Sequence, residues 1–272
     1  MALVSVRDLE MRFGERLIQR GISFDVEPGR IFVVMGGSGC GKSTLLKHMI
    51  GLIEPAAGSI AYEGADYWRA DDRKRLQMRE HFGVLFQGAA LWSSMTLLEN
   101  VCVPLERQGR LDAPAREAKA RELLGLVGLG RFADFFPADI SGGMKKRAGL
   151  ARAIAGEPRL IFLDEPSAGL DPISSKKLDD LILRLRDHCG AAVVMVTHEL
   201  PSIFAIADDG IFLDADSKHP IARGNPRELR DGCDHPTVRA FLRREDVPDP
   251  VPEPGASDAV GADALNSRRE AG

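Results

Sequence analysis

The sequence has no long hydrophobic run, few aromatic residues and no excess of positive charge. No stretch reaches the 18 or more apolar residues that span a bilayer, and the opening MALVSVRDLE contains neither a basic nor an apolar signal region. We therefore expect a protein that stays in the cytoplasm. The formal net charge of −4 gives no global positive field for polyanions, so we expect no nucleic-acid partner.

Cysteine is scarce as well. Cys40, Cys102, Cys189 and Cys233 show no CxxC or metal-ligand spacing, which indicates reduced thiols in a reducing compartment. Apolar residues, in contrast, make up 44% of the 272 residues, enough for a sizeable core. We expect one main domain at residues 1–244, since α/β domains of about 200 to 250 residues form single units. The Pro-, Gly- and Ala-rich acidic residues 245–272 are predicted to be a disordered tail.

The apolar pattern predicts an α/β core. Short β-type runs are followed by helix-type runs, the first of which is predicted at residues 43–51. From about residue 88 to 155 leucine and valine recur at helical spacing with no strand-like run, which predicts a helical subdomain inserted into the core. The predicted strands lie at 3–9, 21–26, 31–35, 83–86, 160–163 and 192–196.

A glycine-rich loop lies between a predicted strand and a predicted helix. Its sequence GGSGCGKST satisfies the GxxxxGK[ST] pattern in the required context. The glycines let backbone N–H groups converge on phosphate oxygens, Lys42 should bridge the β- and γ-phosphates of ATP, and Ser43 should offer its hydroxyl to Mg²⁺. A glycine-rich surface turn is the alternative. The predicted nucleotide-binding residues are Gly36, Gly37, Ser38, Gly39, Cys40, Gly41, Lys42, Ser43 and Thr44.

Two acids end the apolar run LIFLDE. Asp164 is suited to bind Mg²⁺, directly or through a water molecule, and Glu165 is suited to polarise an attacking water. Two acids that simply end a strand in solvent are the alternative. The phosphate loop and these acids together fit a kinase or many GTPases equally well.

The sequence ISGGM opens a helical run that continues to residue 155. The N-terminus of this helix would present backbone N–H donors and a hydroxyl, supplied by Ser141, Gly142 and Gly143. One chain would therefore contain two helix N-termini that can bind phosphate. With SGG upstream of LIFLDEP, the chain resembles the ATPase subunits of ABC transporters from about residue 3 to 232.

The resemblance implies a fold and an assembly. The fold is an α/β P-loop ATPase core with an N-terminal antiparallel β subdomain and an inserted helical subdomain that carries the signature. The assembly is a head-to-tail dimer, in which SGG of one copy caps the γ-phosphate held by the P-loop of the other. Ile140 and Met144 replace the usual leucine and glutamine of the signature. Neither residue supplies the serine or glycine donors, so we expect hydrolysis to survive.

The same resemblance assigns further residues. Phe13 matches an aromatic residue that stacks on adenine, with a core phenylalanine as the alternative. Gln87 matches a glutamine that contacts Mg²⁺ and the attacking water and senses the membrane partner. The loop 167–171, which ends at Asp171, matches a segment that crosses the dimer interface, and His198 matches a histidine that donates to the γ-phosphate.

The segment after Gln87, GAALWSSMTLLENVCVPLE, and the later HPTVRAFLRRE resemble lipid transporters of the Mla/Mce type. This implies membrane permease subunits, an Mce-type lipid-binding protein and a peripheral position on the cytoplasmic face of the inner membrane. Leu91 and Trp92 are either core residues or an exposed docking patch, and DDRKRLQMRE is predicted to be a solvated helix face. Another cargo, or a soluble ABC ATPase that acts on ribosomes or DNA, is the alternative function.

Overall fold

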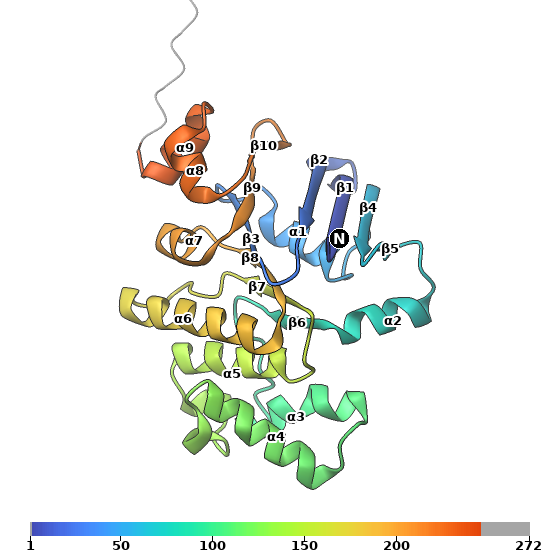
Figure 1. Ribbon diagram of the computed structural model, residues 1–272, viewed down its shortest axis with the longest axis vertical. Coiled ribbons are helices and arrows are strands. Elements are labelled where there is room, and N and C mark those ends of the chain that lie inside the picture. Colours follow the sequence, from blue (N-terminus) through green and yellow to red (C-terminus); the bar gives the residue numbers. More distant parts are fainter. Residues whose placement is uncertain (1, 246–272) are drawn as a thin grey trace, which may run out of the picture.

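A six-stranded sheet forms the centre of the molecule (Figure 1). The computed structural model describes residues 2–245, so the predicted disordered tail lies almost wholly outside the described residues. The strand order is β10-β9-β3-β8-β7-β6, and all neighbours are parallel except β10 and β9. The bounds are β3 Ile31–Gly36, β6 Phe82–Leu85, β7 Leu160–Asp164, β8 Ala192–Val196, β9 Asp209–Leu213 and β10 Pro220–Arg223.

A second, antiparallel sheet precedes it with the strand order β2-β1-β4-β5. The predicted strands at 3–9 and 21–26 are present but longer, since Gly14, with φ +57°, joins them in a tight hairpin. Register shifts interrupt the pairing around Leu9 and Met11, which obscures the alternation in the sequence. The bounds are β1 Val4–Phe13, β2 Arg16–Val26, β4 Ala57–Tyr62 and β5 Ala65–Asp66.

The central sheet separates two apolar cores. Val33 and Met35 of β3 pack with helices α5, α6 and α7, whereas Phe32 and Val34 pack with α1 and the antiparallel sheet. The helices α1 and α5 therefore lie on opposite faces of the sheet, as Figure 1 also shows. The bounds are α1 Lys42–Met49, α5 Gly142–Ile154, α6 Pro172–Cys189 and α7 Leu200–Ile206.

The chain between β6 and β7 contains only helices and turns. Helix α5 approaches β6 closely, since a Cβ atom on Gly83 would lie 2.3 Å from the Ala153 carbonyl oxygen. Before β6, α2 (Asp72–Glu80) buries only Met78, which confirms the predicted solvated face. The helical bounds after β6 are α3 Leu97–Gln108, α4 Ala113–Leu126, and the 3₁₀ turns η1 Gly130–Phe132 and η2 Pro137–Asp139.

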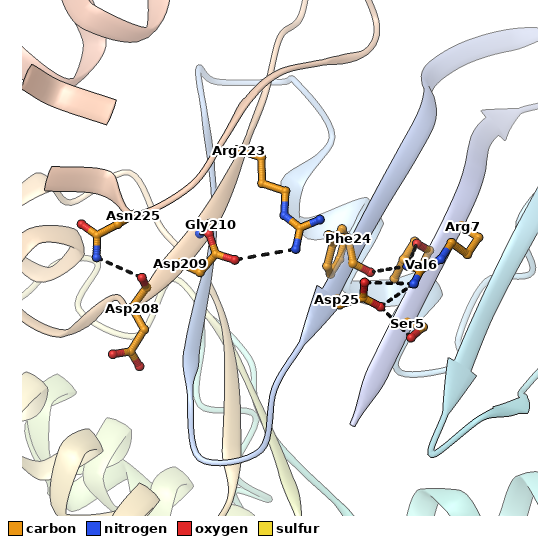
Figure 2. A network of polar contacts seen from close by, with 10 residues as sticks. All are labelled: Ser5, Val6, Arg7, Phe24, Asp25, Asp208, Asp209, Gly210, Arg223 and Asn225. Atoms are coloured by element: carbon orange, nitrogen blue, oxygen red, sulfur yellow. Dashed lines mark hydrogen bonds and ion pairs between the residues drawn. The ribbon is translucent and has the colours of Figure 1, made fainter. Parts of the chain in front are cut away.

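Polar contacts occur where the two sheets meet (Figure 2). Arg223 of β10 lies between Asp209 of β9, at 3.8 Å, and the Phe24–Asp25 segment of β2. Arg7 of β1 donates to the Asp25 carboxylate at 2.7 and 2.9 Å. Two short helices follow β10, α8 (Pro226–Gly232) and α9 (Pro236–Arg243). Within residues 2–245, no helix combines the length and the apolar character that crossing a membrane requires.

Candidate active site

The glycine-rich loop connects β3 to α1 and wraps tightly against its neighbours. Gly36 has φ +140°, and a Cβ atom there would lie 2.3 Å from the Leu213 carbonyl oxygen. At Gly41, with φ +102°, a Cβ atom would lie 2.8 Å from Ile18. Any side chain at these two positions would push the loop outward, so the backbone of a glycine is required. The loop precedes a helix N-terminus, where N–H groups attract anions.

Lys42 places its ammonium group at this loop. Its Nζ donates to the carbonyl oxygens of Gly36 and Gly37, both at 2.8 Å. The buried Cys40 thiol lies 3.9 Å from the same nitrogen, and burial raises the pKa of this thiol. The loop thus combines a fixed cation with exposed glycine backbone at Gly37 and Gly39, which suits a triphosphate.

Gln19 forms a hydrogen bond to the phosphate loop that the sequence did not predict. This fully buried residue of β2 donates through Nε2 to the Cys40 carbonyl oxygen at 2.9 Å and to the Asp214 carbonyl oxygen at 2.6 Å. One side chain therefore joins the phosphate loop to the end of β9. Gln19 lies outside the strand predicted at residues 21–26, and its partners come from positions far along the chain.

Ser43 and Asp164 meet at the carboxyl end of the sheet. The Ser43 hydroxyl donates to Asp164 Oδ1 at 2.9 Å. Burial raises the pKa of Asp164, although the Ser43 hydrogen bond acts in the opposite direction. A hydroxyl and a carboxylate at this separation are the oxygen ligands that Mg²⁺ prefers when phosphate oxygens and water complete its octahedron. Among residues 2–245, no group of three His, Cys, Asp or Glu side chains is placed to hold a metal ion.

Glu165 occupies a strained position just after β7. Its φ of +47° is uncommon for a residue with a side chain, and its N–H donates to the Val196 carbonyl oxygen of β8 at 2.8 Å. Glu165 Oε1 lies 2.8 Å from His198 Nδ1, while Oε2 is buried and has no hydrogen-bond partner among the described residues. The side chain of Glu165 is 10% exposed and that of His198 57%. His198 thus holds one carboxylate oxygen, while the buried second oxygen keeps an unused acceptor position.

Lys146 joins two of these residues and was also missed from the sequence. This buried residue of α5 donates to the Glu165 carbonyl oxygen at 2.9 Å and to the Gln87 carbonyl oxygen. Burial lowers the pKa of Lys146, against the opposing charges of Asp164 and Glu165. Because it lies five residues after Ser141, it links the segment after β6 and the end of β7 to the helix that Ser141 begins.

The remaining predicted residues do not join the phosphate loop. Ser141 is the exposed N-cap of α5 and accepts from the Met144 N–H at 3.3 Å, and Asp171 is the exposed N-cap of α6. Phe13, at the end of β1, is 53% exposed and is therefore no core residue. The Gln87 side chain is exposed as well. Within the described part of the chain, no side-chain hydrogen bond connects these four residues to Lys42 or Ser43.

A glycine loop with a buried lysine, followed by acids at the end of a neighbouring strand, defines a P-loop nucleotide-binding protein. Residues 19–168 match the family model described as ABC transporter, and the chain belongs to that family. The domain of this family binds ATP, and the predicted fold class is confirmed.

Similar proteins of known families are also ATP-binding proteins of transport systems. The chain is 40% identical to the intermembrane phospholipid transport system ATP-binding protein MlaF of Escherichia coli K12, over 88% of both chains. It is 38% identical to "Probable ribonucleotide transport ATP-binding protein mkl" of Mycobacterium leprae, over 88% of this chain and 68% of that protein. The resemblance to the Mla/Mce-type ATPases is therefore confirmed.

Solved structures share the fold. An ATP-binding cassette solved as a dimer with ADP and phosphate bound has a TM-score of 0.73 at 28% identity, over 81% of this chain and 97% of that chain. For cbiO1 of Clostridium perfringens the TM-score is 0.77 at 24% identity, over 85% of this chain and 91% of that one.

Gln19→Leu should weaken ATP binding about tenfold, because both hydrogen bonds by which Gln19 joins the phosphate loop to the end of β9 are lost, and the loop would have to become ordered when ATP binds. The change leaves the Cys40 and Asp214 carbonyl oxygens without their donor. Isothermal titration calorimetry of the full chain measures the affinity, with Gln77→Leu on the exposed face of α2 as the matched control. Wild-type affinity in folded Gln19→Leu would contradict the supporting role.

Proposed function

We propose that the chain hydrolyses ATP to ADP and phosphate and thereby powers a membrane transporter. The observation that carries this proposal is the 2.8 Å contact between Glu165 and His198 at the end of the strand that also supplies Asp164. Glu165 would orient and polarise the attacking water. His198 uses Nδ1 to hold Glu165, so its Nε2 remains for a hydrogen bond to the γ-phosphate. Such catalysis works by positioning and electrostatics, without a covalent intermediate.

Magnesium is the proposed metal cofactor. The 2.9 Å contact between Ser43 and Asp164 supports a role for both residues in binding Mg²⁺, either directly or through a water molecule. The side-chain amide of Gln87 would complete the site. When bound, the ion neutralises charge on the β- and γ-phosphates. Lys42 and the loop 36–44 would hold the same phosphates, and Phe13 would stack on the adenine through its exposed ring.

A second copy of the chain would complete the site. Ser141 and Gly142 at the start of α5 are exposed, and within residues 2–245 Ser141 makes no hydrogen bond to the phosphate loop of its own chain, so this end of α5 is suited to reach the loop of another copy. Ser141, Gly142 and Gly143 would then cap the γ-phosphate across the interface, and the loop that ends at Asp171 would cross it. The dimeric form of a solved relative supports this assembly.

A groove of about 260 Å³ between α3, α5 and β6 is the proposed docking site for the membrane permease. The groove is lined by Val103, Pro104 and Arg107 of α3 together with Trp92, a residue that is 52% exposed. Leu91, in contrast, packs against the core. The predicted docking patch therefore reduces to Trp92 and its neighbours in α3. Docking there would place the chain on the cytoplasmic face of the inner membrane.

Phospholipid is the proposed cargo, with an Mce-type lipid-binding protein as a further partner. The identity of 40% to MlaF over 88% of both chains supports it. The mycobacterial relatives carry a ribonucleotide name, which makes another cargo the alternative. An ATPase that acts on ribosomes or DNA is less well supported, given the net charge of −4.

Glu165→Gln should slow steady-state ATP hydrolysis by about a hundred- to ten-thousandfold, because the amide cannot act as a base. ATP binding should persist, and the variant should accumulate as an ATP-bound dimer. Phosphate release gives the rate, and size-exclusion chromatography with light scattering gives the dimer. Unchanged turnover would remove Glu165 as the base.

Ser141→Arg should impair hydrolysis while the monomer keeps its affinity for ATP, because the serine acts on the nucleotide of the other copy. The change is at an exposed N-cap, so the fold should tolerate it at a cost of about 1 kcal/mol. Fluorescent-nucleotide titration at low protein concentration measures the affinity, with Lys42→Ala as the variant that loses it. Equal losses in both variants would contradict the interface role.

Trp92→Asp should release the membrane subunit, since a charge replaces the exposed ring at the groove. Tagged chain is purified in detergent from its own cells, and the permease, the Mce-type protein and bound phospholipid are quantified by mass spectrometry. Leu76→Asp, an exposed apolar residue of α2, is the matched control. Recovery of ribosomes or nucleic acid in place of a permease would reject the transporter assignment.

A further inference from the structure

A polar cluster is buried between α6 and α7. Asp179 of α6 is 4% exposed and Ser202 of α7 is fully buried. The Ser202 hydroxyl donates to Asp179 Oδ2 at 2.8 Å and lies 3.5 Å from the Ser175 hydroxyl. Around this cluster both helices bury apolar side chains, namely Leu178, Leu181 and Ile182 of α6 and Leu200, Ile203 and Ile206 of α7.

The Asp179 carboxylate is only partly hydrogen-bonded in this interface. Asp179 Oδ1 is buried and has no hydrogen-bond partner among the described residues. Burial raises the pKa of Asp179 to about 6, with Asp180, Glu199 and Lys176 as its charged neighbours. The folded state thus holds this proton more tightly than the unfolded chain, and the associated stability is lost as the pH rises from the ordinary value of 3.8 through about 6. A role beyond stability explains the acid better.

The cluster joins two helices that begin at proposed active-site segments. Helix α6 starts directly after Asp171, and Asp179 lies about two turns into it. Helix α7 has only seven residues and starts two residues after His198, so that Ser202 lies about one turn beyond that histidine. The 2.8 Å bond between Asp179 and Ser202 is therefore a short, continuous connection from the loop 167–171 to His198.

We propose that Asp179 is a positioning residue for hydrolysis, which acts through Ser202 to fix α7, and with it His198, against the helix that follows Asp171. The inference rests on the proposed roles of Glu165 and His198. Apolar packing alone allows a short helix to rotate or slide by a fraction of a turn, whereas a buried hydrogen bond fixes one register. His198, whose own side chain is 57% exposed, then keeps its contact with Glu165.

The test separates positioning from stability. Asp179→Leu should lower kcat about tenfold, because small misplacements of catalytic groups are costly, and leave KM for ATP within about twofold. It should also unfold at the same or a higher temperature at neutral pH. Asp179→Asn keeps an acceptor for Ser202 and should retain most of the wild-type kcat, and Ser202→Ala should lower kcat as much as Asp179→Leu does. Asp180→Asn, an exposed neighbour, is the matched control.

Contrary outcomes are distinct. A wild-type kcat in Ser202→Ala and Asp179→Leu overturns the inference, as does a fall in the kcat of Asp179→Leu that accompanies a fall in its unfolding temperature. If Asp179→Leu does not fold, Ser202→Ala decides. His198→Ala in the same assays tests the underlying proposal: wild-type turnover there removes the function of His198, whereas slow His198→Ala with normal Ser202→Ala removes only the positioning role. In the double variant of His198→Ala and Ser202→Ala, no further loss is expected.

Discussion

The hydrogen bonds that converge on Glu165 are the constraint on which the rest of the structure depends. Its N–H donates to β8, its carbonyl oxygen accepts from Lys146 of α5, and its carboxylate contacts His198. A φ of +47° costs about 1 to 3 kcal/mol and persists only because these contacts determine it together. The conformation of Glu165 therefore depends on β8 lying next to β7 and on α5 packing against the end of β7.

Helix α5 connects this residue to the proposed docking groove. Lys146 reaches the Gln87 carbonyl oxygen, and Arg152, two turns further on, donates to the Ala89 and Ala90 carbonyl oxygens at 2.9 and 2.7 Å. Ala89 and Ala90 both have positive φ values, so the segment after Gln87 is strained and is held by α5. A displacement of that segment by a membrane partner would therefore move the helix that Ser141 begins, and with it the cap on the nucleotide of a second copy.

Much of the fold and of the candidate site could be predicted from the sequence. The buried parallel strands read as continuous apolar runs, and the glycine loop has a spacing that few other structures need. The extension of β1 and β2 was missed because register shifts break their alternation. The strands β9 and β10 were missed because their sequences, DGIFL and PIAR, contain too few consecutive apolar residues. Gln19 and Lys146 could not be found, since each acts through main-chain carbonyl groups that the fold alone brings near.

These missed residues and Asp179 share a physical role. Each is a polar side chain buried where two separate elements meet: Gln19 between the phosphate loop and β9, Lys146 between α5 and the ends of β6 and β7, and Asp179 between α6 and α7. Apolar side chains would stabilise such junctions without the desolvation cost of a polar group, but they would allow more than one relative position of the two elements. Gln19 and Lys146 lie next to loops that would touch the triphosphate, and Asp179 lies between two helices that begin near such loops, where geometry determines rate.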